Sequence, residues 1–263
     1  MTKLWMLAAL PMLAQAAPLS AHPVAVAASP IEASGDEILP HRLTDPSGIH
    51  ILFADPAHRE AAASILAETV RATGRLEGWL EEAGTPTDIP PFPVRLGNER
   101  RVPTASRGAL YLPVARIGEL DGWQTDPMSI QHEIVHLLGS GRRPDRLIVE
   151  GLAVHLADRL GKPTYPNHGE DLDRLLVALE AESGTRIPLL QSEQHRKAAQ
   201  TGVLRRQAYV QEGSFVRWLL ARQGLERLVA EMMDERAWDA DDTDWGALEA
   251  EWRASLPGTS DAR

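Results

Sequence analysis

Two histidines four residues apart, His132 and His136, restrict the fold of this 263-residue chain more than any other feature. Side chains at positions i and i+4 project from the same face of an α-helix, so both imidazoles can hold one zinc ion if the segment is helical. Glu133 lies between them and can face a water molecule beside that ion. The pattern therefore predicts a helix that carries two metal ligands and a general base.

A third ligand has to come from another segment, and Glu150 is the candidate. It follows His136 after a short loop, in the segment Glu150-Gly-Leu-Ala153 of a second expected helix. The chain contains no cysteine, so the ligands must be histidine nitrogens and carboxylate oxygens. His132, His136 and Glu150 would leave the fourth position of one zinc ion per chain for water.

The first twenty residues have the pattern of an export signal. Lys3 precedes a short apolar run that ends in Ala14-Gln15-Ala16. We expect residues 1–20 to be a cleaved signal peptide, with an uncleaved membrane anchor as the alternative, and residues 21–44 to be a flexible tether. The mature protein would then be periplasmic or secreted.

The acidic composition limits the classes of partner. The formal net charge is −10, whereas binding to nucleic acid or to an anionic membrane surface requires clustered Lys and Arg. We therefore expect a peptide or protein substrate, no nucleic-acid partner, and no stable membrane insertion after signal cleavage. Hydrophobic residues make up 43% of the chain, which is enough for a sizeable core.

Hydrophobic periodicity predicts an α+β fold. The expected strands are residues 49–53, 94–96 and 108–114, and the expected helices are residues 57–82, the motif helix from the Asp126 cap to about Gly139–Gly141, and residues 145–160, 170–183, 205–234 and 244–255. These elements divide into an α/β lobe, a helical lobe and a tail, over residues 45–139, 140–256 and 257–263.

The strand expected at 108–114 is interpreted as the edge of the sheet, because Pro113 cannot donate a hydrogen bond to a further strand. This strand precedes the motif helix, so an extended peptide could add alongside it by main-chain hydrogen bonds. Gly108, Ala109 and Leu110 are therefore the candidate substrate-binding residues.

The combination of His132-Glu-x-x-His136 with Glu150-Gly151-Leu-Ala153 resembles the gluzincin zinc metallopeptidases, which include thermolysin and the zinc aminopeptidases. The segment from Tyr209 to Leu219 is similar to the peptidase MA-like branch of this group. The resemblance spans about residues 49–256. It implies a zincin-like fold, with a small mixed-sheet lobe packed on a helical lobe and the metal site between them.

The resemblance also implies roles for individual residues. His132, His136 and Glu150 would be the zinc ligands, Glu133 the general base, and Tyr209 a donor to the developing oxyanion. In the thermolysin pattern, an acid four residues after the ligand glutamate supports a histidine. Here Val154 occupies that position, so the sequence does not show which group orients His132.

The leading hypothesis is an exported metallopeptidase that hydrolyses peptide bonds through a zinc-bound water, with Glu133 as the base. The alternatives are a zinc hydrolase of a non-peptide bond, such as an ester or a cell-wall amide, and a non-catalytic zincin-fold binding module of the cell envelope. The intact Glu133 argues against the binding module. Tyr209 could also be a core residue.

Three further histidines are candidates for the site. His168 and His195 lie in expected loops, where solvation is favoured over substrate contact. His155 lies about 140° around its helix from Glu150, so it should point away from the metal.

Overall fold

Five short strands form one mixed sheet in the computed structural model, which describes residues 37–85, 87–120, 125–138, 146–198, 202–233 and 243–258. The strands are β1 (His41–Thr44), β2 (His50–Phe53), β3 (Pro93–Gly97), β4 (Thr104–Ser106) and β5 (Ala109–Pro113). Their order is β1-β2-β3-β5-β4, with β2, β3 and β5 parallel and the two outer strands antiparallel to their neighbours.

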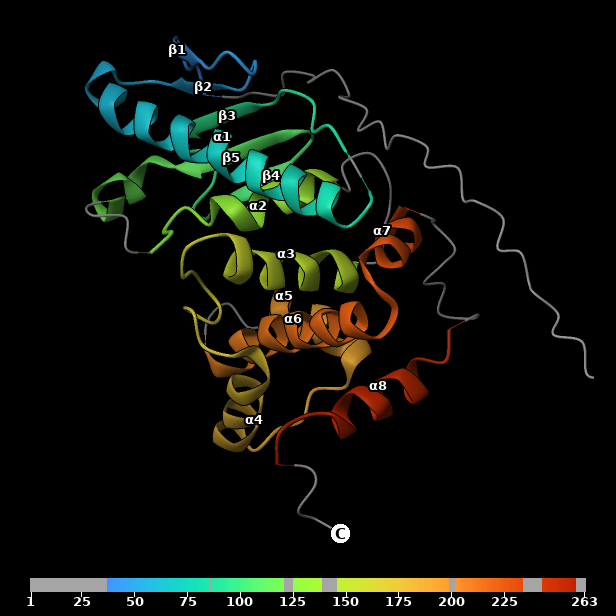
Figure 1. The fold of residues 1–263 in the computed structure, drawn as a ribbon. Helices are drawn as coiled ribbons and strands as arrows, with labels where there is room; N and C mark the ends of the chain where they lie inside the picture. Colours follow the sequence, from blue (N-terminus) through green and yellow to red (C-terminus); the bar gives the residue numbers. More distant parts are fainter. Residues whose placement is uncertain are drawn as a thin grey trace, which may run out of the picture.

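The long helix α1 (Arg59–Glu82) crosses one face of this sheet (Figure 1). Its buried residues recur at helical spacing and include Ile65, Leu76 and Leu80, and the facing strands contribute Ile51 and Val94. Burial of this apolar surface fixes the helix on the sheet. The predicted strand at 49–53 and helix at 57–82 are thus confirmed with small shifts of their ends.

The prediction that residues 108–114 form an edge strand is wrong. β5 lies between β3 and β4, and Ala109 and Leu110 are fully buried, so no peptide can pair with this strand. Gly108 belongs to a two-residue turn with Arg107, in which both residues have positive φ, as the tightest β-hairpins require. The edge is β4, a strand of three residues that periodicity did not reveal.

The prediction of a flexible tether over residues 21–44 is also wrong for its last four residues. Residues 41–44 form β1, which pairs with β2, and the Glu37 carboxylate accepts a hydrogen bond from the backbone N–H of Asn98 at 2.7 Å. The expected signal peptide, the earlier part of the tether and the expected end of the motif helix at Gly139–Gly141 lie outside the described residues.

The remaining chain is helical, and together with the sheet it confirms the α+β class. The further helices are α2 (Ile130–Leu138), α3 (Arg146–Leu160), α4 (Leu172–Ser183), α5 (Ser192–Ala198), α6 (Val203–Gln223), α7 (Leu225–Met233) and α8 (Trp245–Ala254). Short 3-10 helices span Pro56–His58, Val114–Leu120 and Leu189–Gln191. In the part of the chain that the structure describes, no helix is both long and apolar enough to cross a membrane.

Three boundaries differ from the sequence prediction. α2 begins at Ile130 rather than directly after Asp126, although the Asp126 carboxylate accepts a hydrogen bond from the Met128 N–H at 3.1 Å. The single helix expected at 205–234 is two helices, because Gly224 has a φ of 84° and interrupts the helical backbone. α5 was not expected, so His195 lies in a helix and not in a loop.

α6 is the central helix of the helical part and contacts α3, α4, α5 and α7 (Figure 1). Its tightest contact is with α3, where a Cβ atom on Gly151 would collide with the Glu212 carbonyl oxygen and with Val216. A Cβ on Gly213 would lie 2.5 Å from a methyl group of Val154. The two glycines therefore permit a close helix crossing directly beside Glu150.

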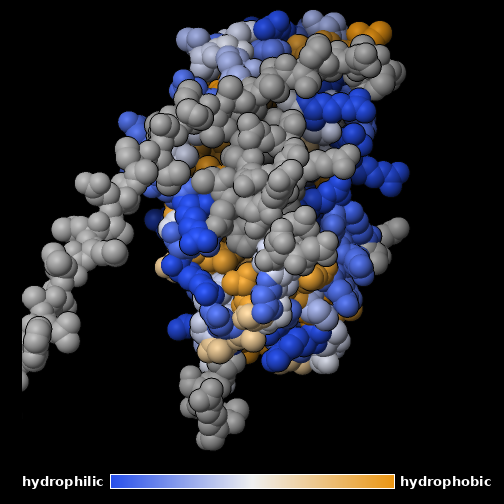
Figure 2. Space-filling view, turned by 90° about the vertical axis from the view of Figure 1, so that its right-hand side faces the viewer, coloured by the Kyte–Doolittle hydropathy of each residue, from blue (hydrophilic) through white to orange (hydrophobic). Residues whose placement is uncertain are grey.

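The outer surface of the molecule is mainly hydrophilic on the face that Figure 2 shows, with hydrophobic patches between the polar residues. In the described part of the chain, the exposed large hydrophobic side chains are few, but two of them, Val102 and Tyr165, are 51% and 40% exposed and lie at cavities beside the candidate site.

Gly151→Ala tests the close crossing of α3 and α6. The added methyl group has no space, so we expect the free energy of unfolding to fall by about 1 to 3 kcal/mol. The matched control is Gly74→Ala in α1, where a Cβ meets nothing within 4 Å and where alanine should stabilise the helix by about 0.5 to 1 kcal/mol. Chemical denaturation of both variants measures the effect, and equal stabilities would contradict the crossing.

Candidate metal centre

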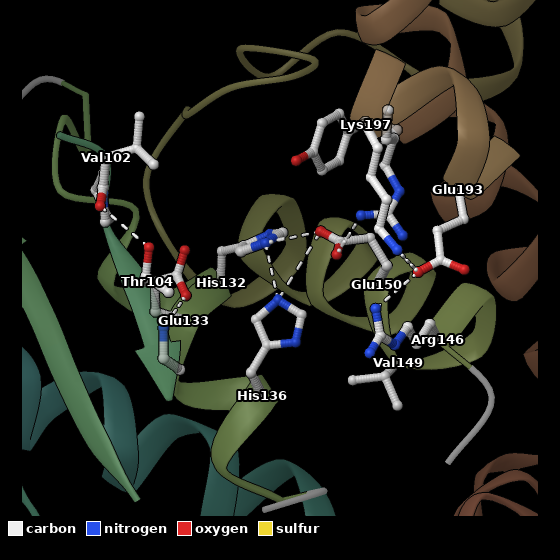
Figure 3. Close-up of a pocket in the computed structure, with 14 residues that line it drawn as sticks. Val102, Thr104, His132, Glu133, His136, Arg146, Val149, Glu150, Glu193 and Lys197 are labelled. Carbon is white, nitrogen blue, oxygen red and sulfur yellow. Dashed lines mark hydrogen bonds and ion pairs between the residues drawn. The ribbon is translucent and has the colours of Figure 1, made fainter. Parts of the chain in front are cut away.

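Three potential metal ligands converge from α2 and α3. The Nε2 atoms of His132 and His136 are 3.2 Å apart, and the Glu150 Oε1 atom lies 3.1 Å from the first and 3.8 Å from the second. Figure 3 shows both imidazoles pointing toward the Glu150 carboxylate. This group could hold a metal ion, as the spacing of the two histidines and the position of Glu150 predicted.

The geometry fits a small ion with tetrahedral coordination. Zinc–ligand bonds of about 2.0 to 2.1 Å place neighbouring ligand atoms of a tetrahedron about 3.3 to 3.4 Å apart. Two of the three distances between the ligand atoms, 3.2 and 3.1 Å, lie close to this value, and the third, 3.8 Å between His136 and Glu150, is longer. Two imidazole nitrogens and one carboxylate oxygen are also a donor set that suits zinc.

The surroundings keep two of the three ligands deprotonated. Burial lowers the pKa of His136 to about 4, so its imidazole is neutral near pH 7 and has a lone pair for a metal. Burial alone would raise the pKa of Glu150, but the hydrogen bond with His132 and the charges of His136, His132 and Arg196 outweigh it and lower the pKa to about 2. Glu150 is therefore ionised and ready to bind a cation.

His132 has a mixed environment. Burial lowers its pKa, but the hydrogen bond with Glu150 and the charges of Glu150 and Glu133 outweigh that effect and raise it. A metal ion would replace the proton that these carboxylates attract. The Nδ1 atom of His132 is buried and has no hydrogen-bond partner among the described residues.

Val154 occupies the position at which the thermolysin pattern has an acid, and in this structure it has a packing role. Its side chain is fully buried and contacts the position of Gly213 in α6. The residue four positions after Glu150 thus stabilises the crossing of α3 and α6 and does not orient a histidine.

Glu133 projects from α2 toward the sheet edge, next to Thr104 in Figure 3. Its Oε2 atom accepts a hydrogen bond from the backbone N–H of Ala105 in β4 at 2.6 Å. Burial raises the pKa of Glu133, against the opposing effects of His132 and the Ala105 hydrogen bond. A fixed carboxylate with a raised pKa is suited to accept a proton and release it again.

Two further charged residues complete the site, and the sequence reasoning missed both. Arg196 of α5 contacts the Glu150 Oε2 atom through Nη1 at 2.9 Å and the Glu212 carboxylate through Nε at 2.8 Å. Glu212 of α6 is completely buried. The available signal was that Glu212 shares a face of its predicted helix with the apolar residues Ala208, Phe215 and Val216, since a buried charge needs a partner.

Arg196 and the two histidines bind opposite oxygens of the Glu150 carboxylate. Oε1 faces His132 and His136, and Oε2 faces Arg196. The guanidinium therefore orients the carboxylate so that one oxygen points toward the histidines. Groups that orient a ligand in this way contribute to metal affinity.

Tyr209 of α6 lies at the same cavity, which has a volume of about 930 Å³. Its ring is half-buried, packs edge-on against Tyr165 with 5.5 Å between ring centroids, and lies 5.2 Å from the Arg196 guanidinium carbon. The cavity is lined by residues of β4, α2, α3, α5 and α6. Tyr209 thus combines core packing with exposure to the candidate site.

The other sequence candidates do not line this cavity. Gly108, Ala109 and Leu110 do not line it, and the edge position from which their substrate-binding role was inferred is wrong because β5 is an inner strand. His168 and His195 do not line it either. His155 lines a separate cavity with Trp79 and Arg159, which agrees with the expectation that it points away from the metal ligands.

The chain was compared with protein-family models, curated proteins and solved structures, and none of them matches it.

Removal of the Arg196 contact should weaken metal binding. Because Arg196→Met alone would leave Glu212 buried and unpaired, the informative variant is Arg196→Met with Glu212→Leu, which removes both charges. We expect its zinc affinity, measured by competition with a chelator, to fall about 10- to 100-fold. Arg146→Gln is the control, since Arg146 lines the same cavity and pairs with Glu193 instead. Unchanged affinity in a folded double variant would contradict the orienting role.

Proposed function

We propose that this protein is a zinc-dependent metallopeptidase with a zincin-like fold. His132, His136 and Glu150 hold the ion, and Glu133 is the general base. The observation that carries the proposal is the convergence of three ligand atoms in a cavity that Glu133 also lines. One wall of that cavity comes from β4 and α2 and the other from α3, α5 and α6, as expected for a metal site between a sheet lobe and a helical lobe.

When bound, zinc supplies a Lewis acid that polarises the substrate carbonyl and makes water a better nucleophile. Glu133 accepts the proton of the attacking water, because its carboxylate faces the cavity while the Ala105 N–H holds it in place. Glu133 then donates that proton to the departing amine.

Tyr209 is the proposed donor to the substrate carbonyl oxygen. A neutral phenol can hydrogen-bond to the negative charge that develops on this oxygen as water attacks. The ring is held by Tyr165 and by the guanidinium groups of Arg196 and Arg205, so the hydroxyl group has a restricted orientation.

A peptide is the preferred substrate because the sheet edge borders the site. β4 is an outer strand, and Thr104 and Ala105 line the cavity with His132 and Glu133. An extended peptide that adds alongside β4 would pass the catalytic groups. β4 replaces β5 as the proposed docking strand. A simple ester, one of the alternative substrates, has no extended peptide backbone to pair with this edge.

The location of the protein remains a prediction from residues 1–20, which carry the pattern of an export signal. A periplasmic or secreted peptidase would meet peptide or protein substrates outside the cytoplasm.

Incubation of the zinc-loaded protein with a mixed peptide pool tests the function. Mass spectrometry should detect new termini, a chelator should abolish cleavage, and added zinc should restore it. If no peptide is cleaved but an ester or a cell-wall amide is hydrolysed with the same dependence on zinc, the peptidase proposal is wrong and the alternative substrate class replaces it.

Glu133→Gln separates metal binding from catalysis. Glutamine preserves the shape of the side chain but cannot accept a proton, so turnover should fall by about 10² to 10⁴ while the zinc content stays at the parental level. Glu193→Gln is the control, because Glu193 lines the same cavity but pairs with Arg146 and Lys197. Near-normal turnover in Glu133→Gln would exclude this residue as the base.

Tyr209→Phe tests the phenol hydroxyl. If the hydroxyl stabilises the transition state, turnover should drop by about 10² or more, with the Michaelis constant, zinc content and thermal stability close to those of the parent. Tyr111→Phe in β5 is the control, since Tyr111 does not line the cavity. Full turnover per folded Tyr209→Phe molecule would assign Tyr209 to packing alone.

A further inference from the structure

A second cavity, of about 480 Å³, adjoins the candidate metal centre. It shares five lining residues with the larger cavity, namely Val102, Pro103, His132, Glu133 and Tyr209. Because the general base and a metal ligand belong to both, a substrate bound at the metal centre would extend directly into the second cavity.

Three arginines line this second cavity: Arg116 from the 3-10 helix Val114–Leu120, and Arg205 and Arg206 from the first turn of α6. Among its described lining residues, Glu133 is the one acid. We call this cavity the arginine pocket. Such a concentration of positive charge contrasts with the formal net charge of −10 of the whole chain.

Two of the three arginines, Arg116 and Arg206, are held in part by neutral backbone carbonyl groups. Arg116 donates to the Pro127 carbonyl oxygen at 2.7 Å, and Arg206 donates to the Pro166 carbonyl oxygen at 2.7 Å. Arg206 also pairs with Glu170 at 3.0 Å, and the Arg205 guanidinium carbon lies 5.8 Å from the centre of the Tyr209 ring. A guanidinium has five N–H donors, so the printed contacts of Arg116 and Arg206 leave donors on these two residues that can bind an anion.

The other walls fit the stem of an amino-acid side chain. Val102, Pro103, Tyr165 and Pro166 provide apolar surface, and Val102 and Tyr165 are among the few exposed large hydrophobic side chains of the described chain. A group with an apolar stem and an anionic end would contact these walls and the guanidinium groups together.

We propose that the arginine pocket binds a carboxylate of the peptide substrate, on a residue next to the bond that is cleaved. This inference rests on the proposed peptidase function and adds a substrate class to it. The carboxylate can belong to an acidic side chain or to the C-terminus of the peptide. Planar guanidinium groups bind both through paired charge-assisted hydrogen bonds.

Matched peptides distinguish the two sources. One pair has Glu or Gln at the positions on either side of the cleavage site, and a second pair has a free or an amidated C-terminus. Loss of the relevant carboxylate should lower kcat/KM by about 10-fold or more. An effect in the first pair identifies an acidic side chain, and an effect in the second pair identifies the terminus. Equal kcat/KM values within both pairs would overturn the inference.

Variants of the pocket connect the preference to the arginines. Arg116→Gln and Arg205→Gln, made separately so that either can report if the other does not fold, should reduce the preference for the carboxylate peptide toward one. Arg174→Gln, on the exposed surface of α4, should leave it unchanged. A full preference in both folded pocket variants would show that the carboxylate binds elsewhere.

A binding measurement keeps this inference separate from the proposed function. Zinc-loaded Glu133→Gln protein should bind the carboxylate peptide about 10-fold more tightly than its neutral partner, whether or not the parent cleaves either one. Binding with this preference but without cleavage by the parent would retain the pocket and reject the peptidase. Cleavage without preference would retain the peptidase and reject the pocket.

Discussion

The site depends on one carboxylate, that of Glu150, which is only 12% exposed and contacts two histidines through one oxygen and an arginine through the other. Glu150 directs one oxygen toward His132 and His136 and the other toward Arg196, whose guanidinium also contacts the buried Glu212. Removing one partner from such a buried ionic group costs about 3 to 5 kcal/mol, so α3, α5 and α6 must keep their relative positions. Gly151 permits the required approach of α6, since any side chain there would collide with the Glu212 backbone.

A second constraint connects this helical network to the sheet. The Ala105 N–H of β4 holds the Glu133 carboxylate, and Glu133 and His132 are adjacent on α2. The edge strand, the proposed base and the ligands are therefore in a fixed geometry before any substrate binds. Preorganised charged groups are commonly the largest single contribution to enzyme catalysis, and these groups would act in this way in the proposed reaction. The arginine pocket opens from the same residues, so substrate selection and chemistry would share a wall of the cavity.

The sequence predicted the parts of the site that depend on local periodicity. Two histidines on one turn of a helix are neighbours in any helix, and the segment around Glu150 has a helical pattern of its own. It did not predict β4, whose three residues are too short to show a period, or the inner position of β5, because strand order is set by long-range pairing. The contact between Arg196 and Glu212 depends in the same way on how α5 packs against α6. The break at Gly224 did have a local signal, since glycine often ends a helix.

Zinc K-edge X-ray absorption of the loaded protein tests the central claim most directly, because it reports the ligands without an assay of activity. The structure predicts a first shell of nitrogen and oxygen atoms at about 2.0 to 2.1 Å, four in number, together with the outer-shell scattering of two imidazoles. A shell of six oxygen atoms, or one without imidazole scattering, would contradict the assignment of His132 and His136 as ligands of one ion.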